Sequence, residues 1–148
     1  MAHTFRNATL VVAALAVILP LAACSSSTTV TATLGEWSIV LDKDSVPAGS
    51  VTFDVTNDGP NDLHEFVVVK TDLAPGDLPV DETGKVDEEG AGITFIGEIE
   101  ELEVGDTGSD TFDLDAGNYV LICNIVDTAD GATEAHYVLG MRLAFTVE

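Results

Sequence analysis

The chain is poor in the residues that form disulfides, bind soft metals or contact nucleic acid. Its 148 residues include two cysteines, two methionines, three histidines and five lysines or arginines, against 26 acidic residues. Because so few cationic side chains are available to neutralise phosphates, we expect no nucleic-acid partner. The acidic excess describes a solvated surface, which would also suit a cationic partner, but it does not identify a function.

The N-terminus has the features of a secretory leader. Arg6 supplies a short basic region, and an almost unbroken apolar run extends from Ala8 to Ala23, which is short for a membrane span. The sequence LAAC that ends at Cys24 resembles the lipobox of bacterial lipoproteins, although an ordinary cleaved leader is an alternative. We therefore expect residues 1–23 to be a lipoprotein signal peptide and Cys24 to be the site of lipid attachment. The protein would be exported and anchored to the outer face of the cell membrane.

The mature chain is predicted to be a short tether followed by one domain. Residues 24–33 are small and rich in hydroxyl groups, which is typical of a flexible tether. Residues 34–148 have the size of a single domain with a modest core, and we expect a monomer. Acylation of Cys24 would leave Cys123 as the one free thiol, so no intramolecular disulfide could form. An unpaired cysteine in an exported protein suggests a metal thiolate.

Most of the domain shows the two-residue alternation of β-strands, with turn residues between the runs. The runs are residues 36–42, 50–59, 63–71, 109–117, 118–126 and 141–148. Together they predict an all-β protein, an antiparallel Greek-key sandwich or barrel. Residues 72–92 contain two prolines and four glycines and are predicted to be a surface loop. Residues 95–104 fit neither a helix nor a strand well, and both remain open.

The few soft ligands of the mature chain gather near its C-terminus. Cys123 lies in an apolar strand, His136 follows after twelve residues, and Met141 after four more. The remaining mature histidine, His64, begins an upstream strand. Two imidazoles, a thiolate and a distant thioether form the ligand set of a mononuclear blue copper site. Thiolate and thioether favour Cu(I), whereas imidazole accommodates both oxidation states.

At these residues the chain resembles the cupredoxin family. The resemblance covers the segments VPAGSVTFDVTNDG, NDLHEFVVV, FDLDAGNYVLICNI and HYVLGMRLAFTV. It implies one type 1 copper ion, with His64, Cys123, His136 and Met141 as its ligands. It also implies electron transfer with a redox partner protein rather than enzymatic activity. Electrons would pass through the imidazole edge of His136, and Tyr137 and Leu139 would form an apolar docking surface.

Two features depart from the family pattern. The loop between Cys123 and His136 is about three times the common length, which would cost only ~1 kcal/mol in closure entropy. The residue after the first histidine is Glu65, where the small electron carriers often have asparagine. A carboxylate cannot donate the same amide hydrogen bonds, so we do not expect the family's usual support of the site at this position.

Other functions remain open. A copper-handling module would use the same ligands without a redox partner, and the long loop before His136 slightly favours it. A metal-free interaction domain with the same fold is a third interpretation, in which Cys123 and Met141 are ordinary core residues. Zinc bound by Cys123 and the two histidines would give Met141 no role. A multicopper enzyme needs additional histidines, which this chain does not have.

Overall fold

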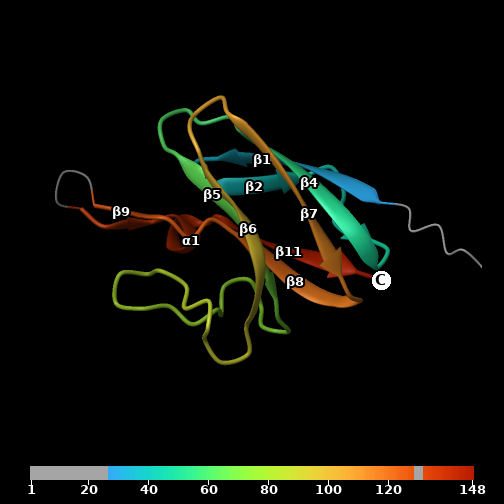
Figure 1. The fold of residues 1–148 in the computed structure, drawn as a ribbon. Coiled ribbons are helices and arrows are strands. Elements are labelled where there is room, and N and C mark those ends of the chain that lie inside the picture. Colours follow the sequence, from blue (N-terminus) through green and yellow to red (C-terminus); the bar gives the residue numbers. More distant parts are fainter. Residues whose placement is uncertain (1–26, 129–131) are drawn as a thin grey trace, which may run out of the picture.

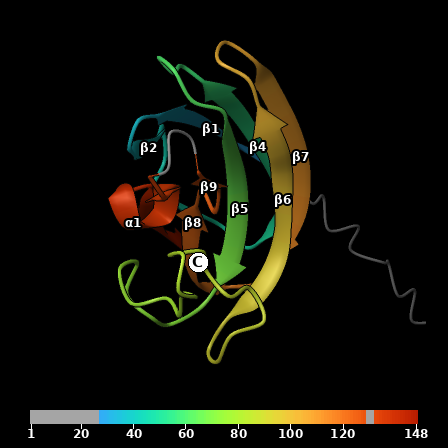
Figure 2. The ribbon, with the colours of Figure 1, turned by 90° about the vertical axis from the view of Figure 1, so that its left-hand side faces the viewer.

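The computed structural model describes residues 27–128 and 132–148, and these residues form a sandwich of two β-sheets (Figures 1 and 2). The first sheet has the order β2-β1-β4-β7, made of Ser38–Leu41, Thr28–Gly35, Gly49–Asn57 and Thr107–Leu114. The second has the order β3-β11-β8-β5-β6, made of Ser45–Val46, Arg142–Val147, Gly117–Ile122, His64–Lys70 and Thr94–Leu102. A hairpin of β9 and β10 and the short helix α1 complete it, at Val126–Asp127, Glu134–Ala135 and His136–Leu139.

The predicted all-β class is confirmed, but the sheets are mixed rather than purely antiparallel. β1 pairs with β4 in parallel, and β3 pairs with β11 in parallel. The chain passes through β2 and β3 between β1 and β4, which is the kind of longer connection that a parallel pair requires. The segment left open at residues 95–104 lies mostly in strand β6, which pairs with β5.

The main core lies between the two sheets and comes from the alternating residues of their strands. Phe53 of β4 is fully buried, and its ring lies 5.1 Å from that of Phe66 and 5.5 Å from that of Phe145. Val51 and Val55 flank Phe53 on the same face of β4 and are also buried. Each such side chain contributes about 1.5–3 kcal/mol when it leaves water. This packing joins the two sheets rigidly beneath the functional site.

A second, smaller core covers the outer face of β5 and β8. It explains why these strands are apolar without interruption, since both of their faces are buried. The connection between β5 and β6, predicted as a surface loop, lies on this face and buries Leu78 and Val86. The other buried members of this cluster are Val67, Val69, Val120, Ile122 and Tyr137.

The predicted tether is wrong for residues 28–33. These residues belong to β1, and Val30 and Ala32 are fully buried between the sheets. The threonines that suggested a flexible segment are the outward-facing half of an alternating strand. The predicted leader and Cys24 lie outside the described residues. Within the described ranges, no helix has the length and hydrophobicity to span a membrane.

Candidate metal centre

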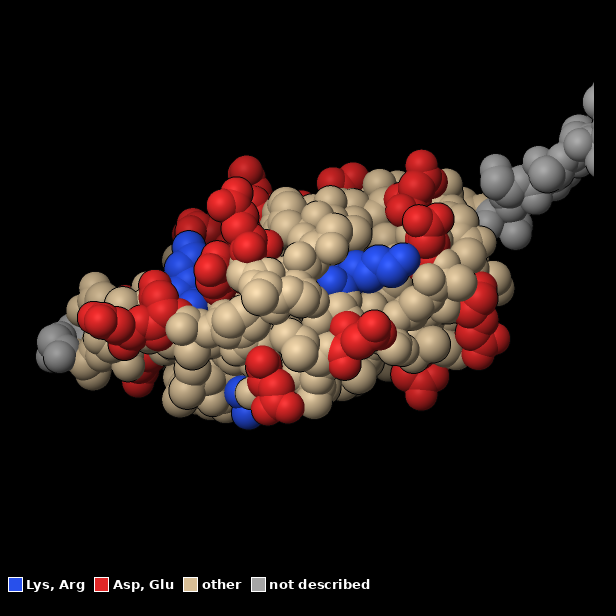
Figure 3. Space-filling view, turned by 90° about the horizontal axis from the view of Figure 1, so that it is seen from below, with Lys and Arg blue, Asp and Glu red and all other residues tan. Residues whose placement is uncertain are grey.

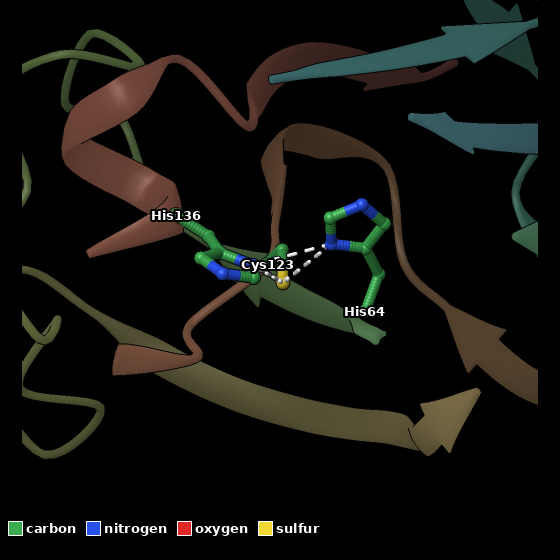
Figure 4. A group of neighbouring side chains, drawn as sticks. All are labelled: His64, Cys123 and His136. Atoms are coloured by element: carbon green, nitrogen blue, oxygen red, sulfur yellow. Dashed lines mark hydrogen bonds between the residues drawn. The ribbon is translucent and has the colours of Figure 1, made fainter. Parts of the chain in front are cut away.

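Three of the four predicted ligands meet at one end of the sandwich (Figure 4). His64 is the first residue of β5, Cys123 directly follows β8, and His136 is the first residue of α1. The Nδ1 atoms of the two histidines are 3.2 Å apart. The Sγ of Cys123 lies 3.3 Å from Nδ1 of His136 and 3.9 Å from Nδ1 of His64. All three residues are buried.

This triangle of donor atoms has the size that a single metal ion requires. The three distances define a point that is about 2.0 Å from each atom. Metal–imidazole bonds in zinc proteins are about 2.0–2.1 Å long, and metal–thiolate bonds about 2.3 Å. An outward movement of the sulfur by a few tenths of an ångström would complete the fit. The residues therefore fit a metal ion held by two imidazoles and one thiolate.

Met141 is joined to the cluster through its backbone. Its carbonyl oxygen accepts a hydrogen bond from the N–H of Cys123 at 3.1 Å, and its own N–H donates to the carbonyl of His136 at 3.0 Å. The side chain is fully buried in the same apolar cluster as Cys123. Its position beside two of the three donor residues agrees with the predicted role, while ligation by its thioether stays a prediction.

The long segment between Cys123 and His136 does not separate the two residues. β9 pairs with β10, and the N–H of His136 donates to the carbonyl of Ile125 at 3.0 Å. The excursion is therefore closed at its base, two residues after Cys123. In Figure 1 this hairpin extends away from the sandwich.

Burial keeps the donor atoms of the metal-free site uncharged. It raises the pKa of the Cys123 thiol to about 12, although hydrogen bonds from the backbone at Glu65 and Ile125 oppose the change. Burial also lowers the pKa of His136 and of His64, and the neighbouring His136 lowers the pKa of His64 further. At neutral pH the site therefore holds a thiol and two neutral imidazoles, and a metal ion must displace the thiol proton.

Glu65 and Asn124 support the site in place of the expected amide. The N–H of Glu65 points to the Sγ of Cys123 at 3.5 Å, and its Oε1 accepts from the N–H of Asn124 at 2.9 Å. The side chain of Asn124 accepts from the N–H of Val86 at 2.6 Å and donates to its carbonyl at 3.0 Å. The β5–β6 connection is thus bonded to the residue next to the cysteine. Asn124 was not predicted as a site residue, and its only signal in the sequence is its position directly after Cys123.

Trp37 was also missed as a site residue. It lies in the turn between β1 and β2, is half-buried, and places its ring 5.0 Å from that of His136 and 6.5 Å from that of His64, edge-on in both cases. The predicted docking role of Tyr137 is wrong, because this residue is 2% exposed. Its hydroxyl donates to the carbonyl of Pro75 and accepts from the N–H of Leu78.

A recess of about 380 Å³ adjoins His136 and is strongly acidic. Its charged lining residues are all carboxylates, namely Asp62, Glu101, Glu103 and Asp127. Acidic side chains are also spread over the face shown in Figure 3, where lysine and arginine are few. The recess therefore gives the edge of the site a negative surface.

Several solved structures are similar to this chain. An auracyanin from the photosynthetic bacterium Roseiflexus castenholzii, in its dithionite-reduced form, shares 26% identity over 82% of this chain and 97% of its own, with a TM-score of 0.55. Auracyanin A, a "blue" copper protein of Chloroflexus aurantiacus, shares 23% identity over 83% of this chain and 100% of its own, with a TM-score of 0.53. Rusticyanin from Thiobacillus ferrooxidans shares 17% identity over 82% of this chain and 77% of its own, with a TM-score of 0.58. No protein-family model and no curated protein matches the sequence.

The chain therefore has the fold of the cupredoxins, with a cluster of His64, Cys123 and His136 at one end of the sandwich. The sequence resemblance to this family is thereby confirmed.

Proposed function

We propose that this chain is an electron-transfer protein that holds one type 1 copper ion and cycles it between Cu(I) and Cu(II). The observation that carries the proposal is the triangle of two imidazole nitrogens and one sulfur, whose corners lie about 2.0 Å from a common point. His64, Cys123 and His136 would hold the ion, and Met141 would supply a weak axial thioether. Copper bound there would supply a one-electron change of charge.

The rigidity of the site supports electron transfer over copper handling. A carrier needs donor atoms that stay in place when the ion changes its charge. The donors are buried, and His136 is bonded through its backbone to both Ile125 and Met141. The long loop before His136 favoured copper handling because a histidine within a long loop would be a mobile ligand. Because the hairpin is closed before His136, that argument for a copper-handling module no longer holds.

We further propose an exported protein that is lipid-anchored at Cys24 and delivers electrons to a partner protein. The leader and the lipobox-like sequence support export and anchoring. The formal net charge of −21 suits a partner with a cationic surface. The proposed role is transport of electrons by a monomer, without an enzymatic reaction at the copper site.

Titration of the metal-free protein with Cu(II) tests the proposed function. We expect one equivalent to produce an intense thiolate-to-copper absorption toward the red end of the visible spectrum, and reversible voltammetry. The Cys123→Ser variant keeps the fold but lacks the sulfur, so it should bind Cu(II) without this absorption. A colourless Cu(II) complex of the wild-type protein would refute the proposal.

A further inference from the structure

The histidines of the metal centre do not reach the protein surface. His64 is 0% exposed and His136 is 1% exposed. The Nε2 atom of each ring is shielded from solvent and has no hydrogen-bond partner among the described residues. The electron route expected from the sequence, through an open edge of His136, therefore has almost no exposed edge to use, although His136 lines the acidic recess.

Trp37 connects both imidazoles to the surface. Its indole contacts His136 and His64 edge-on, with ring-centre distances of 5.0 and 6.5 Å. In the described part of the chain, no other aromatic side chain apart from the two histidines themselves is in ring contact with either imidazole. Trp37 is half-buried, so part of it meets solvent. Electron tunnelling weakens steeply with distance, and a π system between the site and solvent shortens the remaining gap.

Contacts on two sides fix the position of this turn. The Oε1 atom of Glu36 accepts hydrogen bonds from the N–H groups of Asn61 and Asp62, at 2.7 and 2.9 Å, just before His64. On the other side Gly140, at the end of α1, packs against Trp37. A Cβ atom at this glycine would lie 2.9 Å from the carbonyl oxygen of Trp37. The turn that carries the indole is thus held between the segments that carry the two histidines.

The acidic recess beside His136 is the competing route. Asp62, Glu101 and Glu103 lie in its lining, and none of the described residues that line it is a lysine or arginine. Two copies of this protein that met through their recesses would bring like charges together, which opposes their approach. By contrast, Val138 and Leu139 next to Gly140 are 52% and 42% exposed and uncharged. The Trp37 side is therefore better suited to contact between two copies.

We infer that Trp37 is the port through which electrons enter and leave the site. This inference rests on the proposed copper function. In self-exchange, a copy of the protein in the Cu(I) form gives one electron through this port to a copy in the Cu(II) form. The two copies exchange oxidation states, so the reaction needs no other reactant and moves no proton.

Self-exchange of the copper-loaded protein, measured by NMR line broadening, tests the inference. Trp37→Leu should slow the exchange by an order of magnitude or more, with the red absorption and the midpoint potential unchanged. Trp37→Phe keeps a π system and should retain the rate to within a factor of a few. Glu101→Gln, in the recess, is the matched control and should leave the rate unchanged at high ionic strength. If the leucine variant does not fold, Trp37→Met takes its place.

Wild-type exchange in the leucine or methionine variant would overturn the inference. A rate that falls only in Glu101→Gln would also overturn it. So would a changed spectrum and midpoint potential in both Trp37→Leu and Trp37→Phe, because Trp37 would then act by protecting the copper site from solvent. An independent measurement uses the fluorescence of Trp37, the single tryptophan of the chain, in the metal-free protein. Acrylamide should quench it. Absence of quenching would also overturn the inference, because the indole would then not be accessible from solvent. A colourless wild-type Cu(II) complex would instead refute the proposed function and leave this fluorescence result unaffected.

Discussion

The Sγ of Cys123 lies 3.3 Å from Nδ1 of His136, although twelve residues separate the two in the sequence. The hydrogen bond from the N–H of His136 to the carbonyl of Ile125 makes this possible. It returns the chain to the site before the second histidine, next to the pairing of β9 with β10. We therefore expect the metal centre to be independent of the length of the insertion.

Shortening the hairpin should leave the metal centre intact. Asp127 pairs with Glu134, so replacing residues 128–133 by Asn-Gly would join these two residues through a tight turn. We expect the copper absorption and the rate of copper loss to be unchanged, and stability to rise by about 1 kcal/mol from the lower closure entropy. Absorption spectra and denaturant unfolding check this. A same-length Gly/Ser replacement is the control, and loss of colour in the shortened variant alone would contradict the prediction.

Asn124→Ala should destabilise the protein through the β5–β6 connection. The N–H and carbonyl of Val86 would both lose buried hydrogen-bond partners, at a cost of about 2–3 kcal/mol. Denaturant unfolding of the metal-free protein measures the loss. Asn118→Ala removes a single exposed bond to Asp72 and should cost less than about 0.5 kcal/mol. Equal effects of the two substitutions would show that Asn124 has no special structural role.

Most strands could be predicted because they depend on local alternation, and the cluster of His64, Cys123 and His136 followed from residue type and the family resemblance. Val51, Phe53 and Val55 alternate and are buried as expected. The contributions of Trp37 and Asn124 depend on contacts between distant segments, which alternation does not reveal. Asn124 is hydrogen-bonded to Val86, which lies 38 positions away in the sequence. Trp37 contacts His136, although the two residues lie near opposite ends of the domain sequence. The β1 strand was missed because its alternation is between threonine and small residues, which also suit a tether.

Met141→Leu should separate the axial role of the methionine from its packing role. The side chain is fully buried, and leucine conserves its volume, so we expect a loss of stability below about 1.5 kcal/mol. A thioether favours Cu(I) only in comparison with harder donors, whereas leucine supplies no donor at all. If the thioether is the axial ligand, its removal therefore costs Cu(II) more than Cu(I), and the midpoint potential rises. Voltammetry and unfolding of the same preparation measure both effects. An unchanged potential would show that the sulfur does not contact the copper.

Cu(I) affinity should increase with pH because the thiol of the metal-free site is protonated. Burial raises the pKa of Cys123 to about 12, so below that pH each bound ion must displace one proton. The pKa values of His64 and His136 are lowered, so both imidazoles are already neutral above pH 8 and release no proton there. Between pH 8 and 9 the dissociation constant should therefore fall about tenfold, the change that a single displaced proton gives.

Competition with a chromogenic Cu(I) chelator at each pH measures this slope. Cys123→Ser is the control, because its hydroxyl is not expected to ionise and its residual affinity should not change with pH. A wild-type dissociation constant that stays constant over this range would mean that the site already holds a thiolate. The hydrogen bonds from Glu65 and Ile125 would then outweigh the effect of burial on the sulfur.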